Sequence, residues 1–182
     1  MSLHIVHFMR SINPDTLVGL QRVCLTAIEK GATEIRVHLS SNGGDCDEGF
    51  TIYNFLRSLP IKLTMQCVSH VESMAVIMFL AADKRVIVPH GKIKIHPMHW
   101  GFSNGKVDHN RLVEYVDSLD FDTNRYAEIF EERTTGSKNK VNVKKHLAGK
   151  AKLLNSNESI LAGIATKISE VEIPKDAVIW WV

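Results

Sequence analysis

The sequence predicts an α/β fold in which mostly parallel strands alternate with helices. A strand, a glycine-containing loop and a helix follow one another over residues 34–58, which is one βα unit. A second apolar strand at 63–68 leads into a helix of small and apolar residues at 73–82. Two further short apolar segments, 85–88 and 92–96, continue the alternation as strands.

The first elements of the chain have clear boundary signals. Residues 3–9 are predicted to form a short strand. Asn13 and Pro14 then predict a helix start, because Asn caps helices and Pro is favoured in the first turn. The helix is expected to continue to about Lys30 and to end at Gly31.

The middle of the chain supplies the two loops that matter for function. Polar and apolar residues alternate over 34–39, which predicts a strand, and the loop 40–44 that follows contains Gly43 and Gly44. A helix is expected over 47–58. The next strand is predicted to break at Ser69-His70, so that Ser73 lies at the start of the following helix.

The second half of the chain contains a long helix with one apolar seam. Pro and Gly predict a loop over 97–106, and a helix follows over 107–133. Its seam consists of Leu112, Val116, Leu119, Tyr126 and Phe130, with Thr123 at the intervening position. Polar residues occupy most other positions, so we expect a projecting helix whose seam needs a partner.

Shorter elements are predicted at the end of the chain. These are a helix near 141–147, a helix capped by Asn155 and Glu158, and a strand over 164–168. The tail 178–182 is strongly apolar, so we expect it to be buried on this subunit or on a neighbouring one.

Length and composition indicate one ordinary globular domain over residues 1–182. Hydrophobic residues make up 45% of the chain and the net charge is +2, which gives no reason to expect nucleic acid or an anionic membrane as a partner. No apolar run approaches a membrane span, and the first residues lack the pattern of a signal peptide. Three scattered cysteines predict neither a disulfide framework nor a zinc site, so we expect a reducing, cytoplasmic setting.

A serine, a histidine and backbone donors are predicted to meet at one edge of the sheet. A serine becomes a nucleophile when a base accepts its proton and N–H groups stabilise the oxyanion. Ser73 at a strand–helix turn and His96 at a strand end suit the first two roles. Gly43 and Gly44 permit a close approach of substrate, and the N–H of Met74 is a second possible donor.

Each of these residues also has a plainer interpretation. A serine at a helix start is commonly a cap, a glycine pair is commonly a tight turn, and most histidines lie on the surface or in packing. His96 and His99, with His90 or His70 nearby, form a metal-binding pattern that no carboxylate or cysteine completes. We therefore expect no metal and no cofactor, and we interpret Cys46 as a loop residue.

Two segments of the chain resemble a known family. They are EIRVHLSSNGGDCDEGFTIYNFLRSLP and VSHVESMAVIMFLAADKRVIVPHGKIKIHP. Through these segments the chain resembles the proteolytic subunit of the Clp protease, within the ClpP/crotonase-like superfamily. The resemblance covers roughly residues 3–170. The resemblance implies Ser73 as nucleophile, His96 as base, and the N–H groups of Gly44 and Met74 as oxyanion hole. It also implies that 107–133 is the handle helix, which in this family joins two stacked heptameric rings.

The chain departs from the family pattern at several positions. Glu72 stands where the family has a small residue, and Asn42 stands where it usually has proline. A carboxylate beside the nucleophile is expected to disfavour negative charge there. The N-terminus also looks too short for the axial loops through which the family meets its AAA+ unfoldase, which argues against that partner.

The third triad member is missing from its expected place. The family carries a carboxylate just before the last capped helix, but residues 148–154 contain none. Glu158, Asp117 or a backbone carbonyl are alternative partners that would orient His96. A Ser-Lys dyad with Lys150 or Lys152 as base is a further alternative.

Three classes of function follow from these residues. The first is a serine endopeptidase that cuts unfolded polypeptides or peptides inside a homo-oligomeric chamber. The second is a weak or inactive relative with a structural or regulatory role, which Glu72 and the missing acid favour. The third is a crotonase-type enzyme acting on acyl-CoA, for which the sequence shows no clear CoA site.

Overall fold

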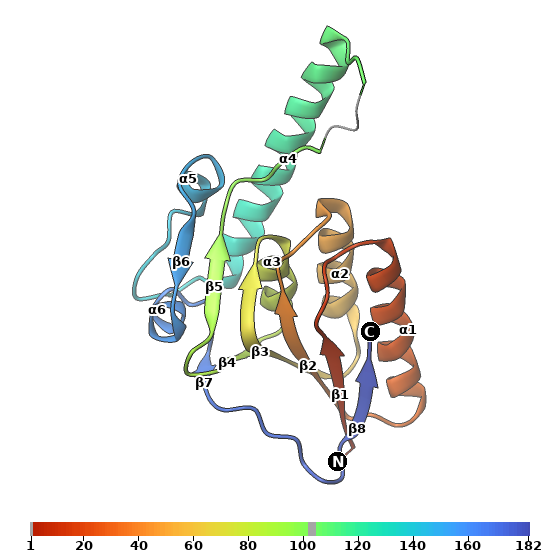
Figure 1. Cartoon of the computed structure of the whole chain (residues 1–182). Coiled ribbons are helices and arrows are strands. Elements are labelled where there is room, and N and C mark those ends of the chain that lie inside the picture. Colours follow the sequence, from red (N-terminus) through yellow and green to blue (C-terminus); the bar gives the residue numbers. More distant parts are fainter. Residues whose placement is uncertain (1, 102–104) are drawn as a thin grey trace.

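The computed structural model describes residues 2–101 and 105–182, and it has the predicted α/β architecture (Figure 1). The loop predicted over 97–106 lies partly outside the described residues. The helices are α1 (Pro14–Glu29), α2 (Cys46–Ser58), α3 (Met74–Leu80), α4 (His109–Arg133), α5 (Val143–Leu147) and α6 (Ser156–Leu161). The strands are β1 (Leu3–Phe8), β2 (Glu34–Ser41), β3 (Lys62–Glu72), β4 (Lys84–Ile87), β5 (Lys92–Ile95), β6 (Lys152–Leu154), β7 (Lys167–Ile168) and β8 (Val178–Trp181).

The strands form one twisted sheet with the order β6-β5-β3-β2-β1-β8, and β4 pairs with both β3 and β7. The pairs are parallel except for β5 and β6. Parallel strands bring their carboxyl ends to the same edge of a sheet. The chain segments that follow β2, β3 and β5 therefore meet at one edge.

The hydrophobic core lies between the sheet and the first helices. Buried side chains of α1 and α2 pack with the inward residues of β1, β2 and β3. Every residue of α3 is buried, because this short helix runs through the middle of the core. The turn before α3 is therefore held by packing on all sides.

The helix α4 projects from the body of the molecule, as the sequence predicts (Figure 1). Its C-terminal half is anchored in the core through Tyr126, Ala127 and Phe130, which are almost completely buried. In its N-terminal half, Leu112 and Val116 of the same seam are 44% and 56% exposed. The N-terminal half of the apolar seam is therefore exposed to solvent in the single chain.

The sequence predicted that the strand beginning near residue 63 breaks at Ser69-His70, and this prediction is wrong. β3 runs on to Glu72 because it changes partners: residues 64–67 pair with β4, and His70, Val71 and Glu72 pair with β5. The pairing of β2 with β3 shifts its register between Leu39 and Ser41. This irregularity lets β3 continue to the turn at Ser73.

The end of the chain differs from prediction in two places. β6 is an additional strand, and the strand predicted over 164–168 is reduced to β7, because the N–H groups of Ile164 and Ala165 bond to the Ser159 carbonyl. The apolar tail forms β8 along the edge of β1. Its burial is incomplete, since Trp181 is 67% exposed.

None of the helices in the described part of the chain is long and apolar enough to cross a membrane.

Candidate active site

Ser73 occupies a sharp turn between β3 and α3 with an unusual backbone conformation. Its φ is 54° and its ψ is −131°, and no other non-glycine among the described residues has a positive φ. Such a conformation costs about 1–3 kcal/mol and persists only where the surroundings impose it. The Ser73 side chain makes no capping hydrogen bond, so the interpretation of this serine as a helix cap is wrong.

Several hydrogen bonds hold the backbone of Ser73. Its N–H donates to the Lys94 carbonyl oxygen at 2.9 Å, and its own carbonyl accepts from Val76 N–H at 2.9 Å. The Tyr126 hydroxyl of α4 donates to the same carbonyl at 3.2 Å. Burial raises the pKa of Tyr126, so the hydroxyl remains a neutral donor. The sequence identified Tyr126 as a seam residue and missed this contact.

Gly43 packs directly against the turn that carries Ser73. A Cβ atom at position 43 would lie 2.6 Å from the Ser73 Cβ and 2.9 Å from the Met74 nitrogen, and the φ of Gly43 is +87°. No side chain fits in that space, and the backbone conformation also favours glycine. The glycine loop and the serine turn therefore meet as the sequence predicted.

The backbone of the glycine loop is fixed by neighbouring segments. Gly43 N–H donates to Ser41 Oγ at 3.1 Å, and the Gly43 carbonyl accepts from Ile12 N–H at 2.9 Å. Within residues 2–101 and 105–182, the N–H groups of Gly44 and Met74 have no hydrogen-bond acceptor. These two donors are the pair that the sequence predicted for an oxyanion hole.

His96 follows β5 at the same edge of the sheet. Glu72 pairs with Lys94 in the β3–β5 register, so Ser73 lies one residue beyond this pair and His96 two residues beyond it. The Nδ1 atom of His96 lies 2.8 Å from the carbonyl oxygen of Pro97. Its ring stacks on that of His99 with 5.6 Å between centroids.

Glu72 is neutralised by two lysines of β5. Its carboxylate lies 2.6 Å from Lys92 Nζ and 3.3 Å from Lys94 Nζ. Burial alone would raise the pKa of Glu72, but the hydrogen bonds and charges of these lysines outweigh it and hold the pKa below its ordinary value. The carboxylate next to Ser73 is therefore ionised, and the two lysines balance its charge.

The carboxylates that the sequence offered as partners of His96 have other positions. Glu158 accepts from Asn155 N–H at 2.9 Å in a capping box, and Asp117 lies on the exposed part of α4. Among the described residues, no ion pair joins His96 to an acid. Its Nδ1 partner in this structure is a neutral backbone carbonyl.

The side chains of Cys46 of α2 and Thr123 of α4 both contact that of Met98. Cys46 Sγ lies 4.0 Å from Met98 Sδ, and Thr123 Oγ1 lies 3.9 Å from the same sulfur. Burial and nearby carboxylates, opposed by Arg125, raise the pKa of Cys46 to about 11. A thiol with this pKa is protonated at neutral pH, which disfavours Cys46 as a nucleophile.

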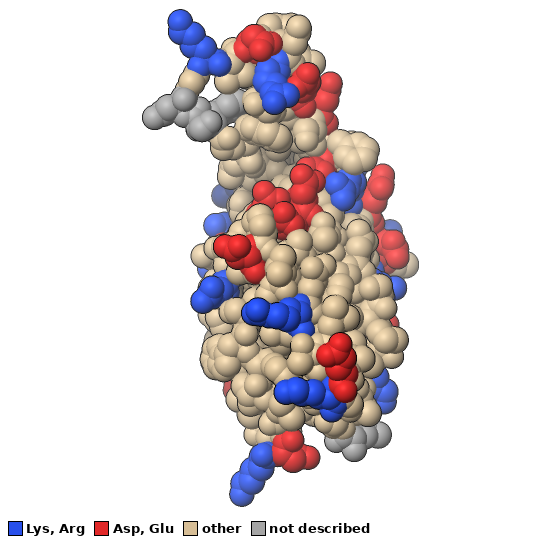
Figure 2. Space-filling model, turned by 90° about the vertical axis from the view of Figure 1, so that its right-hand side faces the viewer, with Lys and Arg blue, Asp and Glu red and all other residues tan. Residues whose placement is uncertain are grey.

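Acidic side chains gather at the base of the projecting helix in Figure 2. Asp122 in the middle of α4 forms an ion pair with Arg125 at 3.1 Å. Burial raises the pKa of Asp122, against the effect of Arg125 and with that of Asp47 and Asp45. No group of three or more His, Cys, Asp or Glu in the described part of the chain is arranged to hold a metal ion.

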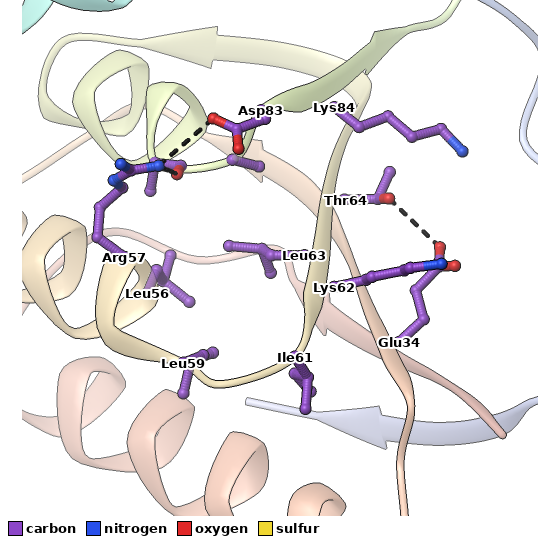
Figure 3. A pocket seen from close by; sticks show the side chains of 12 residues that line it. Glu34, Leu56, Arg57, Leu59, Ile61, Lys62, Leu63, Thr64, Asp83 and Lys84 are labelled. Atoms are coloured by element: carbon purple, nitrogen blue, oxygen red, sulfur yellow. Dashed lines mark hydrogen bonds and ion pairs between the residues drawn. The ribbon is translucent and has the colours of Figure 1, made fainter. Parts of the chain in front are cut away.

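A pocket of about 500 Å³ lies at the opposite end of the strands (Figure 3). It opens beside Glu34 and Lys62, the first residues of β2 and β3, and Arg57 pairs with Asp83 across it at 3.4 Å. Ser73 and His96 follow the last residues of β3 and β5, so this pocket is not part of the candidate site.

The family model and the similar proteins all indicate the same family. The family model described as Clp protease matches residues 3–172. The proteolytic subunit 1 of the ATP-dependent Clp protease from Leifsonia xyli is 25% identical over 123 residues, which are 66% of this chain and 61% of that protein. Subunit 2 from Borreliella burgdorferi is 36% identical over 76 residues, which are 41% of this chain and 38% of that protein. The chain thus matches less than two thirds of the length of these relatives.

A solved structure shows the same fold. A ClpP1 mutant from Listeria monocytogenes superposes with a TM-score of 0.77, covering 93% of this chain and 92% of that one. The sequence identity is 19%, so this likeness concerns the architecture alone. It agrees with the predicted ClpP/crotonase-like arrangement of βα units and a projecting handle helix.

Proposed function

Since the chain belongs to the Clp protease family, we propose that it is a serine-type endopeptidase with Ser73 as nucleophile and His96 as general base. The strained turn at Ser73, packed against Gly43, is the observation that carries this proposal. Strain of this kind is kept where it orients a reacting group. The exposed end of a strand–helix turn is the position that hydrolases with a nucleophile elbow use.

The proposed first step forms an acyl-enzyme. Ser73 Oγ attacks the carbonyl carbon of the scissile peptide bond while its proton passes to His96 Nε2. The N–H groups of Gly44 and Met74, which have no acceptor among the described residues, stabilise the oxyanion. His96 then gives the proton to the leaving amine, and the C–N bond breaks.

The second step is hydrolysis of the acyl-enzyme. His96 takes a proton from water, the hydroxide attacks the ester carbonyl, and the same N–H groups hold the second oxyanion. The proton returns to Ser73 Oγ as the carboxylic acid product leaves. Gly43 is proposed to lie beside the substrate backbone, and its lack of a Cβ is what lets the glycine loop pack against the turn at Ser73.

We propose unfolded polypeptides or peptides as the substrate and a homo-oligomeric chamber in the cytoplasm as the setting. The uncovered half of the α4 seam supports an assembly of several copies, since Leu112 and Val116 are exposed in the single chain. The three cysteines are free thiols, which is consistent with a reducing compartment.

Turnover of an unfolded polypeptide, fluorescein-labelled casein, tests the proposed activity. We expect Ser73→Ala and His96→Ala to lower kcat by at least about 10³-fold, because each removes a group on which the others depend. Ser69→Ala is the matched control, since Ser69 is an exposed serine in the same strand, and it should retain activity. Undiminished turnover by Ser73→Ala would rule out the proposed nucleophile.

A second candidate is a catalytically weak or inactive subunit with a structural role. The observation that favours it is the absence, within the described residues, of a carboxylate paired with His96. An ordered oligomer that shows no turnover and no reaction with serine-directed inhibitors would support this alternative.

A further inference from the structure

We propose that residues 138–152, called the lysine segment below, bind acidic stretches of a polypeptide and bring them to the candidate site. This inference rests on the proposed function, because it names the class of polypeptide that the site would favour. It assigns a role to a charged surface that the serine, the histidine and the glycine loop do not use.

The lysine segment carries a positive charge that nothing nearby balances. It contains six lysines, and no Asp or Glu occurs between Glu132 and Glu158. The whole chain has a net charge of +2, so the segment carries +6 and the remaining residues together carry −4. Among the residues that the structure describes, no ion pair involves any of the six, which are Lys138, Lys140, Lys144, Lys145, Lys150 and Lys152. A surface with this charge attracts anionic groups.

These lysines are presented by folded structure rather than by a free tail. Val143 and Leu147 of α5, in the middle of the segment, are almost completely buried. The N–H of Asn139 donates to the carbonyl of Leu161 at 2.9 Å, which fixes the start of the segment against the end of α6. The backbone of the segment is therefore ordered before anything binds, which lowers the entropy lost on binding.

A hollow of about 220 Å³ lies on this segment. Ammonium and amide N–H groups are donors that suit a carboxylate, and the lining includes two lysines and two asparagines: Lys140, Lys152, Asn139 and Asn142. Glu158 also lines the hollow, but its carboxylate accepts from Asn155 N–H at 2.9 Å in the capping box. The hollow therefore suits the carboxylate of an Asp or Glu side chain.

The lysine segment runs beside the strand that leads to His96. Its end forms the start of β6, which pairs antiparallel with β5, and Lys152 lies opposite Ile95. His96 is the next residue after Ile95. In Figure 1, α5 and β6 lie on the side of β5 that faces away from β3. A polypeptide held on the segment is therefore close to the candidate site.

The other side of the molecule carries the opposite charge. Acidic side chains gather at the base of α4 in Figure 2, which shows the side away from α5 and β6. The two lysines of β5, Lys92 and Lys94, are already paired with Glu72. An acidic stretch is therefore repelled from one side of the site and attracted to the lysine segment on the other.

The distribution of charge favours a polypeptide over a nucleic acid as the partner. The net charge of −4 outside the segment opposes a long chain that is negative at every unit. A polypeptide with one short acidic stretch contacts the segment with that stretch, while its neutral residues lie elsewhere. We therefore assign the segment to acidic polypeptides.

The first test measures kcat/KM for two pairs of peptides that differ only in charge. Each pair shares one fluorogenic core, flanked by four glutamates or by four glutamines, on its N-terminal side in one pair and on its C-terminal side in the other. At an ionic strength of about 0.01 M, where charges act over about 30 Å, we expect the glutamates to raise kcat/KM at least about fivefold in one of the two orders. At about 1 M, where this range is about 3 Å, the preference should fall below about twofold.

A double variant tests whether the segment causes this preference. Lys150→Gln with Lys152→Gln should lower the preference for the glutamate peptide at least about threefold and leave the glutamine peptide unchanged. Lys106→Gln with Lys175→Gln removes two exposed lysines outside the segment and is the matched control. An unchanged preference would overturn the inference. An equal loss of turnover on both peptides would also overturn it, because it would indicate a lysine base rather than selection by charge.

The second test measures binding, which needs no turnover. The Kd of a fluorescein-labelled, glutamate-rich peptide is measured by anisotropy at low salt. We expect Lys140→Gln with Lys145→Gln to bind it at least about threefold more weakly than the wild type. Unchanged affinity, or tighter binding of an oligothymidylate with the same number of charges, would overturn the inference. Intact binding without cleavage of any of the peptides would contradict the proposed function alone, so the two failures are distinguishable.

Discussion

Ser73 and Gly43 show how a site is set by close contact between residues far apart in sequence. The serine has a positive φ, and the glycine fits against it only because it lacks a Cβ. The hydroxyl of Tyr126 and the carbonyl of Lys94 hold the serine backbone in place. The cost of this turn, about 1–3 kcal/mol, is offset by the buried contacts of α3 and α4.

His38 should make the stability of the protein sensitive to acid. Burial, together with His7 and Arg36, lowers the pKa of His38 from 6.5 to about 4. Between these values the unfolded chain binds more protons than the folded one. The free energy of unfolding is therefore fully retained above pH 6.5 and declines as the pH falls toward 4, by at most about 3 kcal/mol from this group.

Urea unfolding of His38→Leu across pH 4–7 tests this expectation. The variant lacks both the titration and a buried Nε2 atom that has no hydrogen-bond partner among the described residues. Its free energy of unfolding should vary less with pH than that of the wild type. His109→Gln changes an exposed histidine and should leave the dependence unaltered. Parallel pH dependences for wild type and His38→Leu would contradict this assignment.

The residues of the site differ in how far the sequence revealed them. The sequence led us to predict Ser73, His96 and the glycine pair as site residues, because their types and local turns are distinctive, and the structure brings the glycine loop and the serine turn together. The contact of His96 with the Pro97 carbonyl was not predictable in this detail, since it involves the backbone rather than a side chain. From the sequence, the charge of Glu72 was expected to disfavour negative charge at Ser73. The structure shows that two lysines on the neighbouring strand balance this charge.

At the scale of elements, the long helices with periodic apolar residues were predictable from the sequence. Strands whose extent depends on pairing with a distant strand were not. The bounds of α1, α2 and α4 agree with the predicted ones to within a few residues, because caps and apolar stripes are local features. The continuation of β3 and the short β6 depend on pairing with β5, which no local pattern announces. The two errors concern the very strands that frame the site.

The uncovered half of α4 should govern assembly. Val116 is 56% exposed on the seam, and we expect Val116→Asp to lower the mass measured by sedimentation, because a charge there opposes burial against another copy. Ser118→Asp introduces the same charge on the opposite side of the helix and is the control. An unchanged mass for Val116→Asp would show that this seam is not the contact.

At the scale of the whole molecule, the sheet collects the site from segments that are distant in the chain. The ends of β2, β3 and β5 bring the glycine loop, Ser73 and His96 to one edge, and α4 supports them from the core. The pocket of Figure 3 lies at the other end of these strands, away from Ser73 and His96. The match of the family model over residues 3–172 is consistent with this arrangement.

The central claim is that Ser73 is a nucleophile activated by its place in the fold. The most direct measurement is the mass of the protein after treatment with an excess of a fluorophosphonate, followed by peptide mapping of the adduct. We predict one adduct per chain, on the peptide that carries Ser73, with none in Ser73→Ala or in urea-denatured protein. An adduct on another residue, or equal modification of Ser73→Ala, would contradict the account.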